Sequence, residues 1–498
     1  MMMVVKRICA VGLGMVGMAM WSSAAFAQDE TSEPAHPKCE GRSMSGATTP
    51  APADPYPLMA AGWGPEVGNG LLYSRWAEDW TGMRAAGKAP PLKAMPLGGD
   101  ASLTLSSEIR LRGLALDNEQ LRREDDYEQG LFRGIVGADL RYNAHLRVYA
   151  EIGTAQVTGR RSTASSRFQN DASIQQLFVE ARTTAGSTLL GAMVGRQEFA
   201  DGPRQLISLG EGPNLHRTWN GVRLYAHDRR IRVGAFDLRA TRFDRGAFEE
   251  DIDHAERLQG MNASLVISPG EGPNTYLEPF WIHSEDPDFR AGDTTGLDDR
   301  DTYGARLWGR KGGFRFDWTL ARQTGDYVDR DIDAWGLFTV QSLEVSEEGW
   351  KPRLTMQIDI ASGGGAYEDG TLKGFNQLYS STNYLGQGRF LSLSNLLFVS
   401  PGLSASPTPS TKLSIEYGFA RRLDENDAAY AGGMRAYSGT QDVDGSEVGG
   451  LLRISGAWSA NEHLTVLAGF EQLAAGDVLD RAGLPSGSYG YVSAAFRY

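Results

Sequence analysis

Apolar and polar residues alternate along short segments through most of this chain. Between residues 102 and 113, Leu103, Leu105, Ile109 and Leu111 fall on one side of an extended backbone. Most of the intervening side chains carry charges or hydroxyl groups. A helix would place its apolar residues three and four positions apart, so the period of two predicts a β-strand.

The same period recurs in about eighteen segments down to the C-terminal tyrosine. Large apolar side chains occupy one face and charges the other in nearly every segment, which is typical of an antiparallel transmembrane β-barrel. A soluble β-sandwich also alternates, but it seldom separates large apolar residues from charges so consistently. The predicted strands cover residues 102–115, 129–141, 145–156, 174–183, 188–199, 218–226, 230–242, 257–267, 274–283, 300–309, 313–323, 332–343, 352–361, 388–399, 411–421, 446–457, 463–473 and 488–498.

Short and long connections alternate between these strands. Bacterial barrels have short periplasmic turns and long extracellular loops, and an even strand count returns the C-terminus to the periplasm. The long polar connections are therefore predicted to be extracellular. They cover residues 117–128, 157–172, 200–217, 243–256, 285–299, 362–387, 422–445 and 474–487.

The N-terminus is typical of an exported protein. Lys6 and Arg7 precede an apolar stretch at residues 8–21, and Ala25-Phe26-Ala27 supplies an A-x-A cleavage site, so residues 1–27 are predicted to be a signal peptide. An exported barrel with an apolar outer face belongs in the outer membrane of a Gram-negative bacterium. The predicted organisation is a signal peptide (1–27), a periplasmic N-terminal segment with a Pro-rich linker and then a Trp-rich stretch (28–100), and a barrel (101–498).

Charge narrows the function of such a barrel. The formal net charge of −13 argues against nucleic acid as a ligand. Eighteen strands leave a water-filled channel, and the inward positions of the twelve most regular strands carry thirteen basic and nine acidic residues. A basic lumen favours anions, although mutually neutralising pairs that only brace the wall are the alternative. The inward positions include Glu108, Arg110, Arg112, Arg133, Arg147, Arg223, Arg315, Arg353 and Arg453.

No motif in the sequence predicts an enzyme, a metal site or a cofactor. A calcium loop starting at Asp329 would need glycine at its sixth position and glutamate at its twelfth, and these are Ala334 and Val340. The sequence contains no phosphate-binding loop and no nucleophile elbow. Any transport is therefore predicted to be passive or driven by a partner.

Several segments resemble the alginate-export family of outer-membrane barrels. An acidic, Trp-containing stretch at residues 75–80 is followed by an L-K-Y-I-P-L-like run at 92–97 and an L-T-L-G-G-E-x-R-like strand at 103–110. Further similar segments lie at 194–199 with 219–224, and at 375–386. The chain departs from the pattern at Ala94, where the family has tyrosine, and at Ser106-Ser107, where it has two glycines.

The resemblance implies a monomeric, eighteen-stranded porin with an arginine-rich constriction for an anionic, alginate-like polysaccharide. Carried over by position, the candidates for this lining are Glu108, Arg110, Arg112, Arg196 and Arg223. Expected partners are the polysaccharide or other small anions, outer-membrane lipid and lipopolysaccharide, and periplasmic secretion machinery. The alternative is a general or nutrient-uptake porin for small anionic or hydrophilic solutes.

Overall fold

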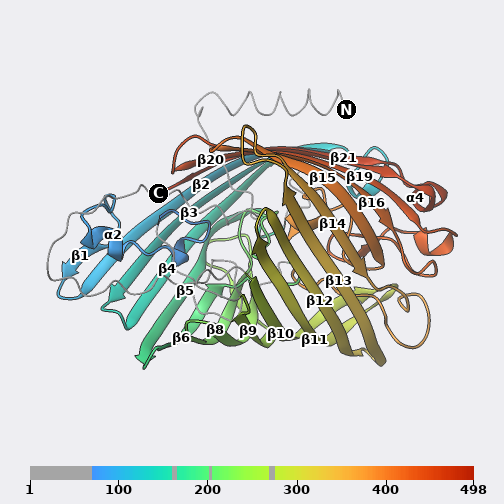
Figure 1. Cartoon of the computed structure of the whole chain (residues 1–498). Helices are drawn as coiled ribbons and strands as arrows, with labels where there is room; N and C mark the ends of the chain where they lie inside the picture. Colours follow the sequence, from blue (N-terminus) through green and yellow to red (C-terminus); the bar gives the residue numbers. More distant parts are fainter. Residues whose placement is uncertain (1–69, 160–164, 201–204, 269–274) are drawn as a thin grey trace.

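A computed structural model describes residues 70–159, 165–200, 205–268 and 275–498. These residues form a closed barrel of eighteen antiparallel strands, which confirms the predicted fold class (Figure 1). The predicted signal peptide and the Pro-rich linker lie outside the described residues. Among the described residues, no helix is long and apolar enough to cross a membrane.

The barrel strands follow one another in chain order. They are β2 (Ala101–Asp117), β3 (Tyr127–Tyr142), β4 (Leu146–Gly159), β5 (Asn170–Ala185), β6 (Thr188–Glu198), β7 (Thr218–His227), β8 (Ile231–Arg242), β9 (Asp251–Val266), β10 (Thr275–Ala291), β11 (Thr294–Lys311), β12 (Phe314–Tyr327), β13 (Arg330–Glu344), β14 (Arg353–Ala361), β15 (Leu396–Thr408), β16 (Thr411–Arg421), β19 (Glu447–Ser459), β20 (Leu464–Ala475) and β21 (Gly487–Arg497).

The first and last strands close the barrel. Strand β2 pairs with β3 on one side and with β21 on the other, where Glu108 lies opposite Arg497 and Asp117 opposite Ser488. Closure pairs the backbone groups of each strand with those of its neighbours, which a membrane requires because lipid offers no hydrogen bonds. The short strand β1 (Met95–Gly98) pairs with the start of β2, beyond the end of β21.

Large apolar side chains cover the outer wall. They include Ile109, Val136, Leu140, Ile152, Leu177, Val179, Val194, Leu224, Met261, Leu320, Leu354, Leu413, Ile415, Phe419 and Ile454, each more than a third exposed. The neighbouring inward residues of β2, β3 and β4 are mostly buried. This separation places the apolar face toward lipid and the polar face toward the lumen, as the alternation predicts.

The two ends of the barrel differ in their connections. At one end, most turns are short, as between β3 and β4 or between β5 and β6, and the C-terminus and β1 lie there (Figure 1). At the other end are the longer loops, including the one that carries α4 (Asp477–Arg481). By the rule for bacterial barrels, the end with short turns is periplasmic and the other is extracellular.

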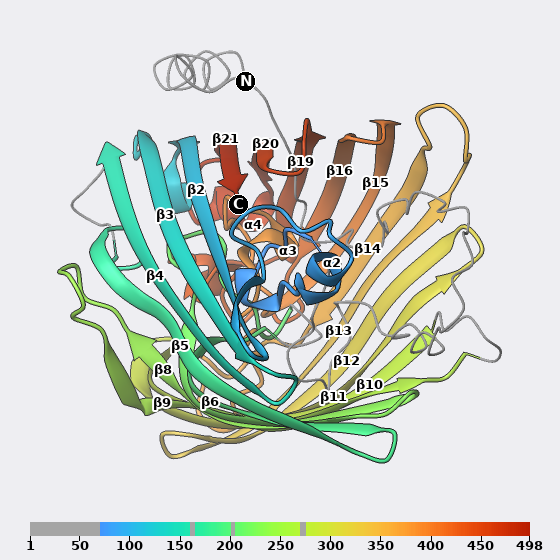
Figure 2. The ribbon, with the colours of Figure 1, turned by 90° about the vertical axis from the view of Figure 1, so that its left-hand side faces the viewer.

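Short elements occupy the remaining connections. Residues before the barrel form η2 (Arg75–Ala77) and α2 (Thr81–Ala85), which lie across the periplasmic opening when the barrel is viewed from that side (Figure 2). The extracellular loops contain η3 (Glu119–Leu121), α3 (Thr382–Leu385), β17 (Tyr430–Ala431), β18 (Arg435–Ala436) and η4 (Thr440–Asp442).

Several predicted strand boundaries are wrong. Residues 285–299 were expected to be a loop, but β10 and β11 continue through them and turn only at residues 292–293. Outside the lipid layer, the outer face of a strand need not be apolar. The polar outer residues of β10 and β11 therefore do not alternate with apolar ones, and the sequence pattern does not indicate a strand there. The strand expected at 388–399 begins instead at Leu396, because the apolar residues before it are buried in the interior of the barrel.

Candidate functional site in the lumen of the barrel

A buried carboxylate on β2 is shared by three arginines. Glu108 accepts hydrogen bonds from Arg75 at 3.0 Å and from Arg497 at 2.8 Å, and it also pairs with Arg133 of β3. Arg75 additionally pairs with Glu151 of β4 at 3.0 Å. Three guanidinium groups therefore meet two carboxylates, which leaves one positive charge in excess at this point of the lumen.

Arg110 and Arg112 follow on the same face of β2, further toward the extracellular end. Arg110 donates to the carbonyl oxygens of Glu211 at 3.3 Å and Pro213 at 2.8 Å, and Arg112 donates to that of Gly212 at 3.4 Å. Both side chains are buried, and the Nε atom of each lacks a hydrogen-bond partner. Within the described part of the chain, neither arginine forms an ion pair. Their charges are therefore held by neutral acceptors, which an incoming carboxylate could replace.

Two loops cross the lumen and join each other near these arginines. The loop between β6 and β7, described at residues 199–200 and 205–217, meets the loop between β14 and β15 (residues 362–395) through backbone hydrogen bonds. The Ser208 amide donates to the Tyr379 carbonyl at 2.9 Å, and the Tyr379 amide donates to the Leu206 carbonyl at 2.8 Å. Together these loops narrow the channel from opposite sides of the wall.

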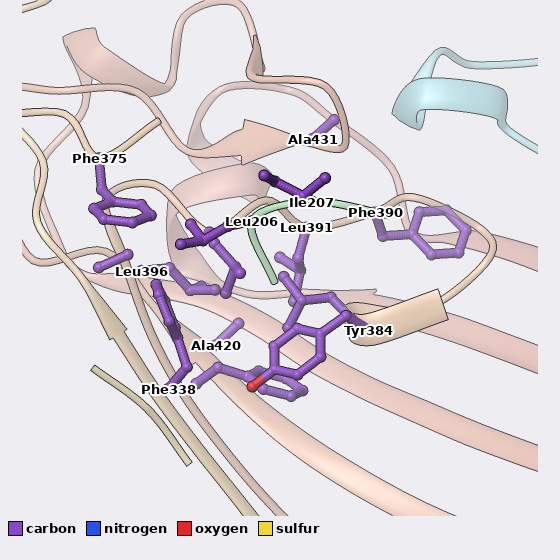
Figure 3. Close-up of a cluster of buried hydrophobic side chains, with 14 of the residues drawn as sticks. Leu206, Ile207, Phe338, Phe375, Tyr384, Phe390, Leu391, Leu396, Ala420 and Ala431 are labelled. Carbon is purple, nitrogen blue, oxygen red and sulfur yellow. The ribbon is translucent and has the colours of Figure 1, made fainter. Parts of the chain in front are cut away.

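An apolar core fills the interior around the paired loops. Figure 3 shows Leu206 and Ile207 from the first loop beside Leu391 and Phe390 from the second, with Phe338 and Ala420 supplied by the barrel wall. Each of these side chains is at most a few per cent exposed. An open lumen of this width would be lined by polar groups in contact with water, so the apolar contact marks a built constriction.

Inward side chains of the wall fasten the second loop. The carboxylate of Glu471 on β20 accepts hydrogen bonds from the amides of Gln387 at 2.7 Å and Gly388 at 2.8 Å. The Tyr384 hydroxyl donates to Asp359 of β14 at 2.7 Å. These contacts hold the loop against the wall on two sides.

The charged side chains in the periplasmic half of the lumen pair with one another and show no excess of bases. On β3 and β4, Arg147 pairs with Asp139 at 2.7 Å and with Glu180 at 3.4 Å, and Arg141 pairs with Asp139 at 3.0 Å. Arg141 also pairs with Asp79, at 2.5 Å. The two bases and three acids here agree with the alternative in which lumen charges brace the wall. The excess of positive charge lies further toward the extracellular side, from the arginines around Glu108 to Arg110 and Arg112.

Comparison with known proteins identifies the barrel. A protein-family model described as alginate export matches residues 101–492, most of the chain. The chain belongs to the alginate-export family. It is accordingly an outer-membrane porin of a Gram-negative bacterium, and a channel rather than an enzyme. Among curated proteins, none matches it in sequence.

Solved porin structures share the fold of this alginate-export barrel. OpdK from Pseudomonas aeruginosa, in a structure with vanillate, aligns with a TM-score of 0.52 at 12% identity, over 79% of this chain and 98% of that one. A BenF-like porin from Pseudomonas fluorescens Pf-5 has a TM-score of 0.53 at 11% identity, over 79% and 98%. OccK2 (OpdF) from Pseudomonas aeruginosa, in complex with glucuronate, has a TM-score of 0.50 at 12% identity, over 79% and 96%. At these identities, the likeness shows the fold alone.

Two further predicted arginines of the alginate-export barrel face the lumen at the level of the crossing loops. The Arg223 guanidinium lies 4.8 Å from the centre of the Phe199 ring. Arg453 donates to the Tyr384 carbonyl at 3.0 Å and pairs with Glu416 at 2.6 Å. Arg453 therefore supports the loop between β14 and β15, and Arg223 lies beside Phe199, at the start of the loop between β6 and β7.

The other two predicted arginines lie near the periplasmic turns. Arg353 begins β14 and pairs with Glu344 at the end of β13. Arg315 shares a face of β12 with the fully buried Thr319, so it is directed inward near the start of that strand. Neither Arg353 nor Arg315 lies next to Arg110 and Arg112.

Arg196 does not line the lumen. In the pairing of β5 with β6 it lies directly opposite Leu177, which is 48% exposed on the outer wall. Directly paired residues of an antiparallel sheet point to the same face, so Arg196 is directed outward. Its guanidinium pairs with Glu250 at 3.0 Å. The prediction that Arg196 contributes to the pore lining is wrong.

Loop arginines that the strand pattern missed extend the positive charge toward the extracellular side. Arg167 donates to the Leu215 carbonyl at 3.0 Å, and burial together with neighbouring Arg217 lowers the pKa of Arg167 to about 9. The Arg217 guanidinium lies 4.7 Å from the centre of the Tyr379 ring. Irregular loops show no period of two, so no sequence signal placed these cations. Nowhere in the described part of the chain do acidic, histidine or cysteine side chains gather into a metal site.

His216 links the crossing loop to the charged wall. Arg133 donates to its Nε2 atom at 2.8 Å, and Glu198 lies 2.5 Å from its Nδ1 atom. Burial, together with the charge of Arg133, lowers the pKa of His216 below its ordinary value. Because a guanidinium can only donate, Nε2 must accept, and the ring is neutral with its proton on Nδ1.

Proposed function

We propose that this barrel passes carboxylated sugars by passive diffusion and that its substrate is an anionic, alginate-like polysaccharide. The observation that carries the proposal is the pair Arg110 and Arg112, whose guanidinium groups rest on backbone carbonyls rather than on carboxylates. A uronate carboxylate offers them a charged acceptor in place of a neutral one, which is the stronger hydrogen bond.

Weak and exchangeable contacts suit transport. A channel must bind its substrate well enough to admit it and weakly enough to release it. Arg110 and Arg112 have neutral acceptors to return to when a carboxylate leaves, so binding and release exchange one set of hydrogen bonds for another. The fixed ion pairs around Asp139 offer no such exchange. We therefore place substrate recognition on the extracellular side of Glu108.

A second candidate is the uptake of small cyclic carboxylates. It is favoured by the two loops that join across the lumen, because they leave less room for a polymer than for a single ring. OpdK in its structure with vanillate and OccK2 in its complex with glucuronate are porins of the same fold that hold small carboxylates. Export of a polymer would involve periplasmic secretion machinery, whereas uptake would not.

The two candidates differ in how substrate length affects the channel. We expect uronate oligomers to block the ion current of the reconstituted mature chain. If the substrate is the polymer, the block should strengthen as the oligomer lengthens. Block by monomeric glucuronate alone, with no effect of longer oligomers, would favour uptake. Neutral glucose oligomers of matched length are the control. If they block as well as the uronates do, the proposed role of the arginines is contradicted.

A further inference from the structure

Residues 70–94, here called the plug, occupy the periplasmic part of the lumen (Figure 2). The plug includes η2 and α2, and it contacts inward side chains of β2, β3, β4, β5 and β6. It precedes the barrel in the chain and supplies none of the eighteen wall strands.

A buried cation fixes the plug to the wall. Arg75 reaches Glu108 of β2 and Glu151 of β4 with the same distance of 3.0 Å, and all three side chains are at most 1% exposed. The two carboxylates keep other partners, since Glu108 also pairs with Arg133 and Glu151 accepts from Tyr149 at 2.8 Å. Without Arg75, Glu108 would keep the cations Arg133 and Arg497, whereas Glu151 would keep only neutral donors.

An aromatic side chain of the plug fills the space next to this ion pair. Trp76 packs against Tyr149, Phe178 and Met193, all of them inward residues of the wall. Its Nε1 atom donates to Glu198 at 3.0 Å. A buried indole with a satisfied donor is a strong packing contact, so the plug closes this part of the lumen with an apolar seal as well as with ion pairs.

The plug also touches the loop that forms the constriction. The Tyr73 hydroxyl lies 2.9 Å from His216 Nε2, and the Ser74 hydroxyl donates to Glu198 at 2.7 Å. Glu198 and His216 are themselves in contact at the two ends of the loop between β6 and β7. The plug and the constriction thus form one continuous obstruction along the lumen.

Backbone-to-backbone hydrogen bonds join the plug to the wall only near its end, although the wall side chains of Arg141 and Arg147 donate to the Glu78 and Trp76 carbonyls. Within the described residues, the backbone hydrogen bonds between plug and wall begin at Leu92, whose carbonyl accepts from the Leu105 amide at 2.9 Å. Further back, the plug is folded on itself, because Lys93 pairs with Glu78 at 3.0 Å and Arg84 donates to the Pro90 carbonyl at 2.7 Å. Its withdrawal therefore breaks side-chain contacts but no strand ladder.

From these contacts we propose that residues 70–94 are an autoinhibitory plug that swings into the periplasm, about a hinge near Leu92, to open the channel. The closed state is the one held by Arg75, Trp76 and Tyr73. This inference rests on the chain being a channel and not on the choice of solute. Its test therefore uses potassium chloride and a neutral sugar, so that a failure of the plug and a failure of the proposed substrate are distinguishable.

The first variant removes the contacts of the plug. We expect Arg75→Ala with Trp76→Ala to raise the mean open time in planar bilayers, and the rate of arabinose entry into liposomes, at least about tenfold over the wild-type mature chain. Lys88→Ala is the matched control, because Lys88 is an exposed cation of the same segment. Heat-modifiable migration on gels checks that both variants contain a folded barrel.

The second variant holds the plug in place. Ser74→Cys with Glu198→Cys, made in a Cys39→Ser background, allows a short thiol-to-thiol crosslinker to tie the plug to β6. We expect crosslinking to abolish openings and a reducing agent to restore them. If the crosslinked barrel conducts as before, or if the folded alanine variant opens no more often than Lys88→Ala, residues 70–94 are a fixed part of the wall and the proposal is overturned.

Discussion

Replacing Arg110 and Arg112 together by glutamate is expected to change the channel from chloride-selective to potassium-selective. These two arginines are the buried lumen cations of β2 that rest on carbonyl oxygens rather than on carboxylates. The double substitution changes the local charge by four units at the point where the loop between β6 and β7 contacts β2. A ring of charge at a constriction sets the sign of the permeant ion, so the reversal potential in a KCl gradient should change sign.

A matched control separates this effect from net charge. Arg229 lies exposed in the periplasmic turn between β7 and β8, outside the lumen. Arg229→Glu makes the same change of charge per residue and is expected to leave the reversal potential within a few millivolts of the wild type. If the control shifts selectivity as much as the double variant does, the field of the whole protein decides selectivity and the assignment to Arg110 and Arg112 is wrong.

Removing the loop between β14 and β15 is expected to increase the single-channel conductance several-fold. The loop supplies Phe375, Tyr384, Phe390 and Leu391 to the apolar core that crosses the lumen. Strands β14 and β15 are already in register at their extracellular ends, where Ala361 lies opposite Leu396. An Asn-Gly dipeptide in place of residues 363–394 can therefore close the hairpin with a tight turn.

The control for this deletion shortens a connection that lies outside the lumen. Residues 347–349 are exposed in the periplasmic turn between β13 and β14. Their removal is expected to leave conductance unchanged. A folded loop-deletion variant that conducts no better than this control would show that the loop does not form the constriction.

The sequence predicts the wall of the barrel well because lipid acts on every strand in the same way. Outward residues such as Ile415 and Phe419, which are 48% and 57% exposed, must be apolar, and a period of two results. The prediction fails for strand residues that do not face lipid, because these need not be apolar. Strands β10 and β11 extend beyond the membrane through residues 285–299, where polar residues on the outer face are read as a loop.

The candidate site is predicted only in part, for a related reason. Alternation places Arg110, Arg112 and Arg133 in the lumen because outward apolar residues such as Ile109 and Val136 lie on the opposite faces of their strands. It cannot place the loops, because the pairing of Leu206 with Tyr379 joins segments far apart in the chain. Nor does any local pattern indicate that Arg75 enters the lumen to meet Glu108.

Arg196 shows the limit of carrying a residue over by position. Its strand has apolar residues on both faces, including Met193 directed inward and Val194 directed outward. Alternation therefore gives no direction for the side chain, and the resemblance alone placed it in the lumen. The register with Leu177 decides that it faces outward.

The central claim is that an excess of arginine charge makes this lumen selective for anions. The most direct measurement is the reversal potential of the refolded mature chain in a planar bilayer with a KCl gradient. The account predicts a potential of the sign set by chloride, and a current that falls as uronate oligomers are added to one side and block the openings. A potential of the opposite sign, set by potassium, with a current that uronates leave unchanged, would contradict it.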